Sequence, residues 1–204
     1  KTSASRQTFV SGNAARLDAE DLRRQILRLG NVGERAEMRI EGARVLLRDG
    51  AAERRLELVD LPELSKGCVL MGTGAYDPKT TALDADGQGT PYETYGFGAQ
   101  VAAVEVDTEL GTVKVLRIVA AHDVGCAVNP TQVEGQIHGG IAQGLGLALM
   151  EEYIPGRTEN LHDYLMPTIG DVPPIETILI EDPEPAGPFG AKGVGEPALI
   201  PTAP

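Results

Sequence analysis

The segment from Asn129 to Leu149 constrains the fold most, because it combines a regular helical pattern with five glycines. Asn129-Pro130 is a typical helix start, in which a capping residue is followed by proline at the first position. Apolar residues then recur at helical spacing: Val133, Ile137, Ile141, Leu145 and Leu149. We therefore expect one face of this helix to lie in the core.

Glycine occupies positions 135, 139, 140, 144 and 146 of the same segment. Each glycine inside a helix costs about 1 kcal/mol relative to alanine, so the missing side chains indicate a close neighbour. That neighbour is either another backbone or sheet that packs tightly, or a flat ligand. Gln132, Gln136 and Gln143 share a face beside the glycines and are candidate cofactor contacts, because amides both donate and accept hydrogen bonds.

A second glycine-dense segment, residues 190–197, carries a single carboxylate at Glu196. Three glycines within residues 190–195 indicate unusual dihedrals or the close approach of another group. Pro197 favours an extended Glu196 and suits the first position of a helix, so we expect Glu196 at a helix N-terminus. There the helix dipole favours the ionised form that a general base requires. A turn in which Glu196 is merely a helix cap fits the motif equally well.

The apolar spacing of residues 14–29 predicts a helix that ends at Gly30. Residues 2–7, ahead of it, form a segment of small, hydroxyl-rich residues. This segment contains one threonine, two serines and Arg6. These are either ordinary cap and turn residues or an anion site. Hydroxyls, backbone amides and a guanidinium ahead of a helix suit phosphate oxygens.

Two hairpins and one further strand complete the predicted α+β fold, with mixed sheets and packed helices. The first hairpin covers residues 38–47, and the second joins 95–107 to 112–121 through a turn at 109–111. Residues 175–180 read as a strand. The stretch 72–94 is rich in Gly, Thr, Asp and Pro, which is typical of a long loop or of a division of residues 1–204 into two lobes.

Composition excludes several classes of function. A net charge of −12 at pH 7 disfavours nucleic acid and anionic membrane surfaces as partners. No run of eighteen apolar residues and no secretion-signal pattern occurs, so we expect no membrane span. The two cysteines are isolated, so we expect a reducing, cytoplasmic location. Both ends look cut, because the chain begins with Lys1 and stops abruptly at Pro204.

Metal and hydrolase motifs are missing from the sequence. Cys68 and Cys126 are isolated, so we expect no thiolate-built iron–sulfur or zinc site. The His122-Asp123 and His162-Asp163 pairs lack ligand-like spacing, and we expect His122-Asp123 to be a structural hydrogen-bonded pair. No nucleophile elbow, Walker loop or dinucleotide fingerprint occurs in a suitable context.

Three ordered segments closely resemble the molybdenum hydroxylases, the family of xanthine dehydrogenases and aldehyde oxidases. They are residues 123–130, the helical residues 133–144 and residues 193–197. The resemblance extends from Ser3 through residues 97–99 to the end of the chain. It implies the fold of the C-terminal half of the molybdopterin-binding domain of xanthine dehydrogenase.

The resemblance also implies an activity and individual roles. Glu196 matches the family's catalytic base. The matches to pterin contacts are Ser3, Ala4, Ser5, Arg6, Gln7 and Gln143, with Ala4 near the metal centre. No side chain ligates molybdenum in such enzymes, because the pterin dithiolene holds it. The implied reaction is hydroxylation of an N-heterocycle or aldehyde with water as the oxygen source.

The same resemblance implies missing parts. The family's upstream half, with a Gly-Gln-Gly contact segment and a substrate-binding arginine, is absent, and Gly87-Gln88-Gly89 lies on the wrong side of Ser5. We therefore expect an incomplete site for the molybdenum–molybdopterin cofactor. The remainder of this subunit, a [2Fe–2S] cluster and FAD are expected in partner subunits or missing domains. An inactive fragment or scaffold of the same fold, or an unrelated acidic interaction domain, are the alternatives.

Overall fold

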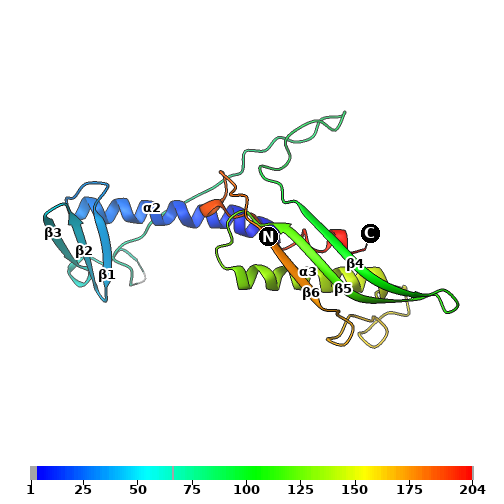
Figure 1. Cartoon of the computed structure of the whole chain (residues 1–204). Coiled ribbons are helices and arrows are strands. Elements are labelled where there is room, and N and C mark those ends of the chain that lie inside the picture. Colours follow the sequence, from blue (N-terminus) through cyan, green and yellow to red (C-terminus); the bar gives the residue numbers. More distant parts are fainter. Residues whose placement is uncertain (1–3, 66, 204) are drawn as a thin grey trace. The chain divides into compact units, whose positions relative to one another are not determined.

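The computed structural model describes residues 4–65 and 67–203, which form two compact units. Residues 11–77 form one unit, and residues 78–204 together with residues 1–10 form the other. The division between Asp77 and Pro78 lies inside the glycine- and proline-rich stretch of the sequence. Figure 1 shows the elements of both units along the chain.

The unit of residues 11–77 packs helix α2 against a three-stranded antiparallel sheet. Helix α2 spans Gly12–Leu29, and the strands are β1 (Glu37–Glu41), β2 (Arg44–Asp49) and β3 (Ala52–Glu57), in the order β1-β2-β3, followed by the 3-10 turn η2 (Leu58–Asp60). Its core consists of Ile26, Leu27, Ala36, Val45 and Leu47. The predicted helix and the predicted β1–β2 hairpin are both confirmed.

The residues before α2 are helical, which corrects the expectation of an irregular segment. Ala4–Arg6 form the short helix α1, and Gln7–Ser11 form a π-helical turn, η1, that continues into α2. Residues 4–11 contain no glycine or proline that would disfavour a helix. Phe9 is buried, so a helical conformation of this segment is also stabilised by packing. Ser5, Arg6 and Gln7 are therefore residues of a helix rather than of a loop ahead of one.

The second unit contains one mixed sheet in the order β4-β5-β6. Strands β4 (Gly98–Asp107) and β5 (Thr112–Asp123) form the predicted antiparallel hairpin. Strand β6 (Ile175–Ile180) pairs with β5 in parallel, which requires a crossover connection, and helix α3 (Pro130–Leu149) lies in it. Both the helix and β6 agree with the prediction.

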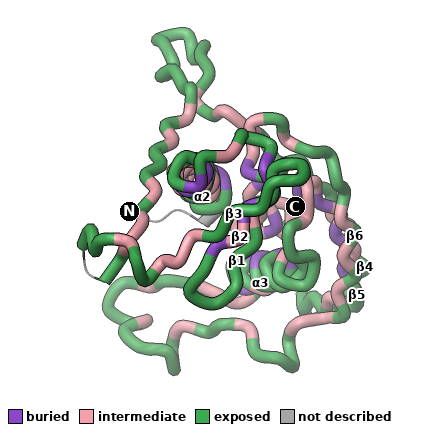
Figure 2. The backbone as a smooth tube through the Cα atoms, turned by 90° about the vertical axis from the view of Figure 1, so that its left-hand side faces the viewer, coloured by how far each residue is buried: buried purple, intermediate pink, exposed green. Residues whose placement is uncertain are grey.

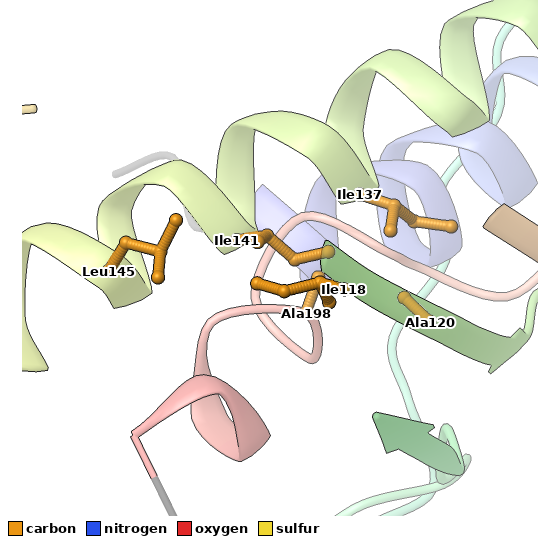
Figure 3. Packing of buried hydrophobic residues seen from close by; sticks show 6 residues of the cluster. All are labelled: Ile118, Ala120, Ile137, Ile141, Leu145 and Ala198. Carbon is orange, nitrogen blue, oxygen red and sulfur yellow. The ribbon is translucent and has the colours of Figure 1, made fainter. Parts of the chain in front are cut away.

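Helix α3 packs on the sheet through the apolar stripe seen in the sequence as far as Leu145, whereas Leu149 at the end of the stripe is 48% exposed. The core cluster contains Ile118, Ala120, Ile137, Ile141, Leu145 and Ala198. Figure 3 shows these side chains between α3 and β5, together with Ala198 from the C-terminal segment. Ile137 and Ile141 are fully buried, and burial of each stabilises the fold by about 1.5–3 kcal/mol.

Four of the five glycines of α3 fall into two groups. A Cβ on Gly140 would lie 2.9 Å from the Cβ of Ala198, and one on Gly144 would lie 2.5 Å from the Cβ of Thr202. These two glycines therefore admit a neighbouring stretch of chain. A Cβ on Gly135 or Gly139 would meet nothing within 4 Å, so that side of the helix is open.

The long connections of this unit are mostly exposed. Residues 79–90 are exposed throughout, and Figure 2 shows buried positions concentrated on the helices and on the strands that they cover. Short 3-10 turns, η3 (Pro188–Gly190) and η4 (Ile200–Thr202), are the regular elements of the C-terminal segment. Within the described ranges, no helix is long and apolar enough to cross a membrane.

Candidate active site

The Glu196 loop lies directly against the N-terminal helix. The amide of Glu196 donates a hydrogen bond to Oγ of Ser5 at 3.1 Å. A Cβ on Gly193 would lie 2.2 Å from the carbonyl oxygen of Ser5, so only glycine permits this approach. The structure thus brings together two segments that the sequence singled out at opposite ends of the chain.

An open hollow of about 310 Å³ lies beside this contact. Ser5, Arg6 and Glu196 line it, and the loop of residues 91–96 contributes another wall. Its apolar lining comes from Phe9, Val10, Pro78, Pro91, Tyr92 and Pro197. The Tyr92 ring meets the Tyr95 ring edge to face, with centroids 6.1 Å apart. We call this space the Glu196 hollow; it combines an exposed carboxylate with apolar and aromatic walls.

A second hollow, of about 580 Å³, lies along the first turns of α3. Its lining is Thr8, Thr131, Gln132, Gly135, Gln136, Val194 and Gly195. We call it the polar hollow. Residues 193–196 border both spaces, since Gly193 and Glu196 line the Glu196 hollow while Val194 and Gly195 line the polar hollow. The space in front of Gly135 is free, because an added Cβ would meet nothing there.

The amide and hydroxyl groups of the polar hollow match the hydrogen-bonding needs of a pterin. Gln132 and Gln136 each offer amide donors and acceptors, and Thr8 and Thr131 offer hydroxyls. The open face of Gly135 leaves room for a flat ring system. The residues present therefore fit a molybdopterin-type cofactor on one side.

The structure brings together only some of the predicted site residues. Ser5, Arg6 and Glu196 line the Glu196 hollow. Gln7 and Gln143 are exposed and line neither hollow. Ala4 begins α1, and Ser3 lies outside the described residues.

The position of Gln143 follows from helix geometry. It lies two turns beyond Gln136, about 10 Å further along the helix axis at 1.5 Å per residue. The three glutamines that the sequence placed on one face of the helix therefore do not border the same space. Gln132 and Gln136 line the polar hollow, and Gln143 lies further along the helix.

Glu196 does not lie at the N-terminus of an α-helix, contrary to expectation. Its carbonyl accepts a hydrogen bond from the amide of Leu199 at 3.2 Å, and turns lead from there into η4. Pro201 removes a backbone donor and clashes with a preceding helical turn. Within the described residues, the position of Glu196 therefore depends on contacts of its loop rather than on a helix dipole.

Lys192 and Asp123 form a buried ion pair near Glu196 that the sequence did not predict. Nζ of Lys192 lies 2.5 Å from Oδ2 of Asp123, and the two side chains are 8% and 9% exposed. The hydrogen bond to Asp123 raises the pKa of Lys192 above its ordinary value, although burial acts in the opposite direction. The sequence shows a lysine in the glycine loop and an aspartate at a strand end, but no local pattern links positions 69 residues apart.

His122 and Asp123 do not pair with each other, which corrects the expected structural pair. Neighbouring residues of a strand point to opposite faces, and His122 lies near Gln100, with their Nε2 atoms 3.3 Å apart, while Asp123 contacts Lys192. Gln100 also donates to the carbonyl of Ala198 at 2.8 Å. Burial lowers the pKa of His122, so its ring is neutral near pH 7.

Comparison with known proteins identifies the family. A model of the molybdopterin cofactor-binding domain matches residues 1–173. The xanthine dehydrogenase molybdenum-binding subunit of Escherichia coli O157:H7 is 34% identical over 215 residues, which cover 98% of this chain and 27% of that subunit. The nicotine 6-hydroxylase large subunit of Paenarthrobacter nicotinovorans is 34% identical over 156 residues, covering 74% of this chain and 19% of the relative.

Solved structures agree with these relatives. The aldehyde oxidoreductase from Desulfovibrio desulfuricans ATCC 27774 superimposes with a TM-score of 0.74 at 32% identity, covering 98% of this chain and 20% of that chain. Quinoline 2-oxidoreductase from Pseudomonas putida 86 gives a TM-score of 0.69 at 30% identity, covering 99% and 27%. The chain thus spans 27% or less of the length of each of these relatives. The family resemblance and the α+β fold read from the sequence are confirmed, and the chain belongs to the molybdopterin cofactor-binding domains of the molybdenum hydroxylases.

Proposed function

We propose that this chain is part of a molybdenum-dependent oxidoreductase that hydroxylates an N-heterocycle or an aldehyde, with water as the oxygen source. The observation that carries the proposal is the hydrogen bond between Glu196 and Ser5, which joins two family motifs in one site. The proposal is also supported by the relatives, whose names denote enzymes that act on xanthine, nicotine, quinoline and aldehydes.

The cofactor would be held along the polar hollow. When bound, the molybdenum–molybdopterin cofactor supplies the oxidising centre of the reaction. Gln132 and Gln136 would bind its polar edges through their amides, and Thr8 and Thr131 through their hydroxyls. Contacts from Ser3, Ala4, Ser5, Arg6, Gln7 and Gln143, which match the family's pattern, belong to the same proposal. The remainder of the molybdopterin-binding subunit would complete the site.

Glu196 would act as the general base. Its carboxylate lines the Glu196 hollow and is exposed, so it can accept a proton when water gives its oxygen to the substrate. The hydrogen bond to Ser5 fixes the backbone of Glu196, and the close approach at Gly193 fixes the backbone three residues earlier. A base positioned in this way contributes about 10²- to 10⁴-fold to the rate.

The wider organisation follows from the same proposal. The two compact units would be two lobes of the C-terminal part of the domain. Electrons would leave through a [2Fe–2S] cluster and FAD on partner subunits or on domains outside this chain. We place the assembly in the cytoplasm.

Isotope labelling tests the proposal on the natural assembly. After reaction with a heterocycle or aldehyde in ¹⁸O-labelled water, the new hydroxyl or carboxyl oxygen of the product is expected to carry the label. Molybdenum and pterin are expected to copurify with the chain and its partners. Unlabelled product would refute water as the oxygen source, and an assembly that lacks both molybdenum and pterin would support the scaffold alternative.

A further inference from the structure

The loop that carries Glu196 is attached to the sheet on both sides of the carboxylate. Before it, the amide of Lys192 donates to the carbonyl of Val124 at 3.0 Å, and Ala191 forms an isolated β-bridge with Gly125. After it, Ala198 is fully buried, and its carbonyl accepts a hydrogen bond from Gln100. Five residues, 193–197, span the distance between these attachments, and two of them are glycines that give the chain freedom.

Lys192 and Asp123 form the first attachment at the side-chain level. Their ion pair is buried at the end of β5, and Oδ1 of Asp123 also accepts a hydrogen bond from the amide of Gly125 at 3.0 Å. The aspartate therefore binds the loop and the strand end at once. Asp182 and Glu184 add a weaker attraction on the ammonium.

A buried ion pair is a poor source of stability, because the loss of hydration offsets much of the attraction between the charges. What the pair can contribute is position, because the carboxylate of Asp123 holds both the Lys192 ammonium of the loop and the amide of Gly125. A pair located four residues before the proposed base, in a loop with two glycines, is suited to fixing the position of that base.

We propose that the buried Asp123–Lys192 pair is a positioning device that holds the Glu196 loop in register for proton transfer. This inference rests on the proposed function, since it assigns to the pair the placement of the base. Lys192 also lines the Glu196 hollow, but its ammonium is bonded to Asp123. The role assigned to both residues therefore acts through Glu196, which makes them positioning residues. A displacement of about 1 Å at a reacting group can lower the rate about 100-fold, so loss of the pair is expected to affect kcat far more than KM.

The decisive variant removes both charges together, as Asp123→Asn with Lys192→Met, because a single neutralisation leaves the other charge buried and unpaired. The full-length subunit would be purified with its partners. We expect kcat for a heterocycle or aldehyde to fall by about tenfold or more, with KM and molybdenum content close to those of the parent. Lys192→Arg, which keeps the charge, is expected to retain more activity than Lys192→Met.

A double-mutant cycle separates positioning from a general structural role. In the Glu196→Gln background, removal of the pair is expected to lower kcat no further, because the base that it positions is already lost. The inference would be overturned if removal of the pair lowered kcat by the same factor in the Glu196→Gln background as in the parent. It would also be overturned if the variant without the pair kept the parental kcat. If the double variant does not assemble, Asp123→Asn alone, which keeps an acceptor oxygen and the side-chain size, is tested in the same cycle with the same criteria. Full activity of Glu196→Gln itself would instead overturn the proposed function.

Discussion

The backbone amide of Glu196 donates a hydrogen bond to the side-chain oxygen of Ser5 at 3.1 Å, between residues 191 positions apart in the sequence. This bond and the close contact of Gly193 with the Ser5 backbone join the ends of the chain in one site. The location of Glu196 therefore depends on a residue of the N-terminal helix, and changes at either end are expected to affect the same reaction.

Ser5→Ala is expected to lower kcat modestly. It removes the acceptor of the Glu196 amide, and a single hydrogen bond contributes about 1 kcal/mol net, or about fivefold in rate if it acts fully on the base. Ser5→Thr keeps the hydroxyl and is the matched control. Steady-state kinetics of the intact assembly checks the prediction, and equal activity of the alanine and threonine variants would contradict it.

Two adjacent glycines of α3 are expected to respond in opposite ways to alanine. Gly139→Ala adds a methyl group in open space and is expected to stabilise the helix by about 0.5–1 kcal/mol. Gly140→Ala places that methyl 2.9 Å from the Cβ of Ala198 and is expected to destabilise the protein by about 1–3 kcal/mol. Denaturant unfolding of the two variants measures the contrast. Equal stabilisation of both would show that the C-terminal segment does not pack on Gly140.

Variants of the three glutamines of α3 are expected to differ in the molybdopterin content of the purified assembly. Gln132→Leu and Gln136→Leu remove amides from the polar hollow and are expected to lower the molybdopterin content of the purified assembly. Gln143→Leu, two turns further along the helix, is expected to lower that content less, since Gln143 lines neither hollow and its contact would depend on the remainder of the subunit. A larger loss in the Gln143 variant than in the other two would contradict the polar hollow as the main contact of this chain with the cofactor.

Stability is expected to fall on acidification through His122. Burial lowers the pKa of His122 below 6.5, the ordinary value that applies to the unfolded chain. The unfolded state therefore binds more protons in this range, so stability is full above pH 6.5 and decreases as the pH falls from 6.5 towards the folded-state pKa.

Thermal unfolding at pH 7.5 and 5.5 measures this effect. The decrease in Tm is expected to be smaller in a His122→Gln variant than in the parent. His162→Asn, a change at an exposed histidine, is expected to leave the decrease unaltered. An identical pH response of the parent and the His122 variant would show that another group is responsible.

The helices and hairpins were predictable because their signals are local. The cap at Asn129, the apolar stripe of α3 and the valine-rich hairpin each depend on residues close in sequence, and the structure contains all of them. The π-helical turn at Gln7–Ser11 was missed, because no residue type marks it. Glu196 was expected at a helix N-terminus from Pro197 alone, but Pro201 is incompatible with a regular helix there.

The site was less predictable than the fold. The family resemblance indicated Glu196 and Ser5, which the structure brings into contact. Helical spacing indicated Gln132 and Gln136 as candidate contacts, but the hollow that they line depends on how α3 meets the loop that carries Val194 and Gly195. The Asp123–Lys192 pair likewise depends on how that loop meets the end of β5. Such contacts between distant segments have no period or spacing in the sequence.

The most direct test of the central claim is the rate of substrate oxidation in a single turnover by the Glu196→Gln variant. The intact, molybdenum-loaded assembly would be mixed with excess heterocycle or aldehyde, and reduction of its redox centres followed by absorbance. Glu152→Gln, at an exposed position outside both hollows, is the matched control. We predict a rate about 10²- to 10⁴-fold lower for Glu196→Gln at equal molybdenum content, with the control unchanged. A Glu196→Gln assembly that oxidises substrate at the parental rate would contradict the assignment of Glu196 as the base.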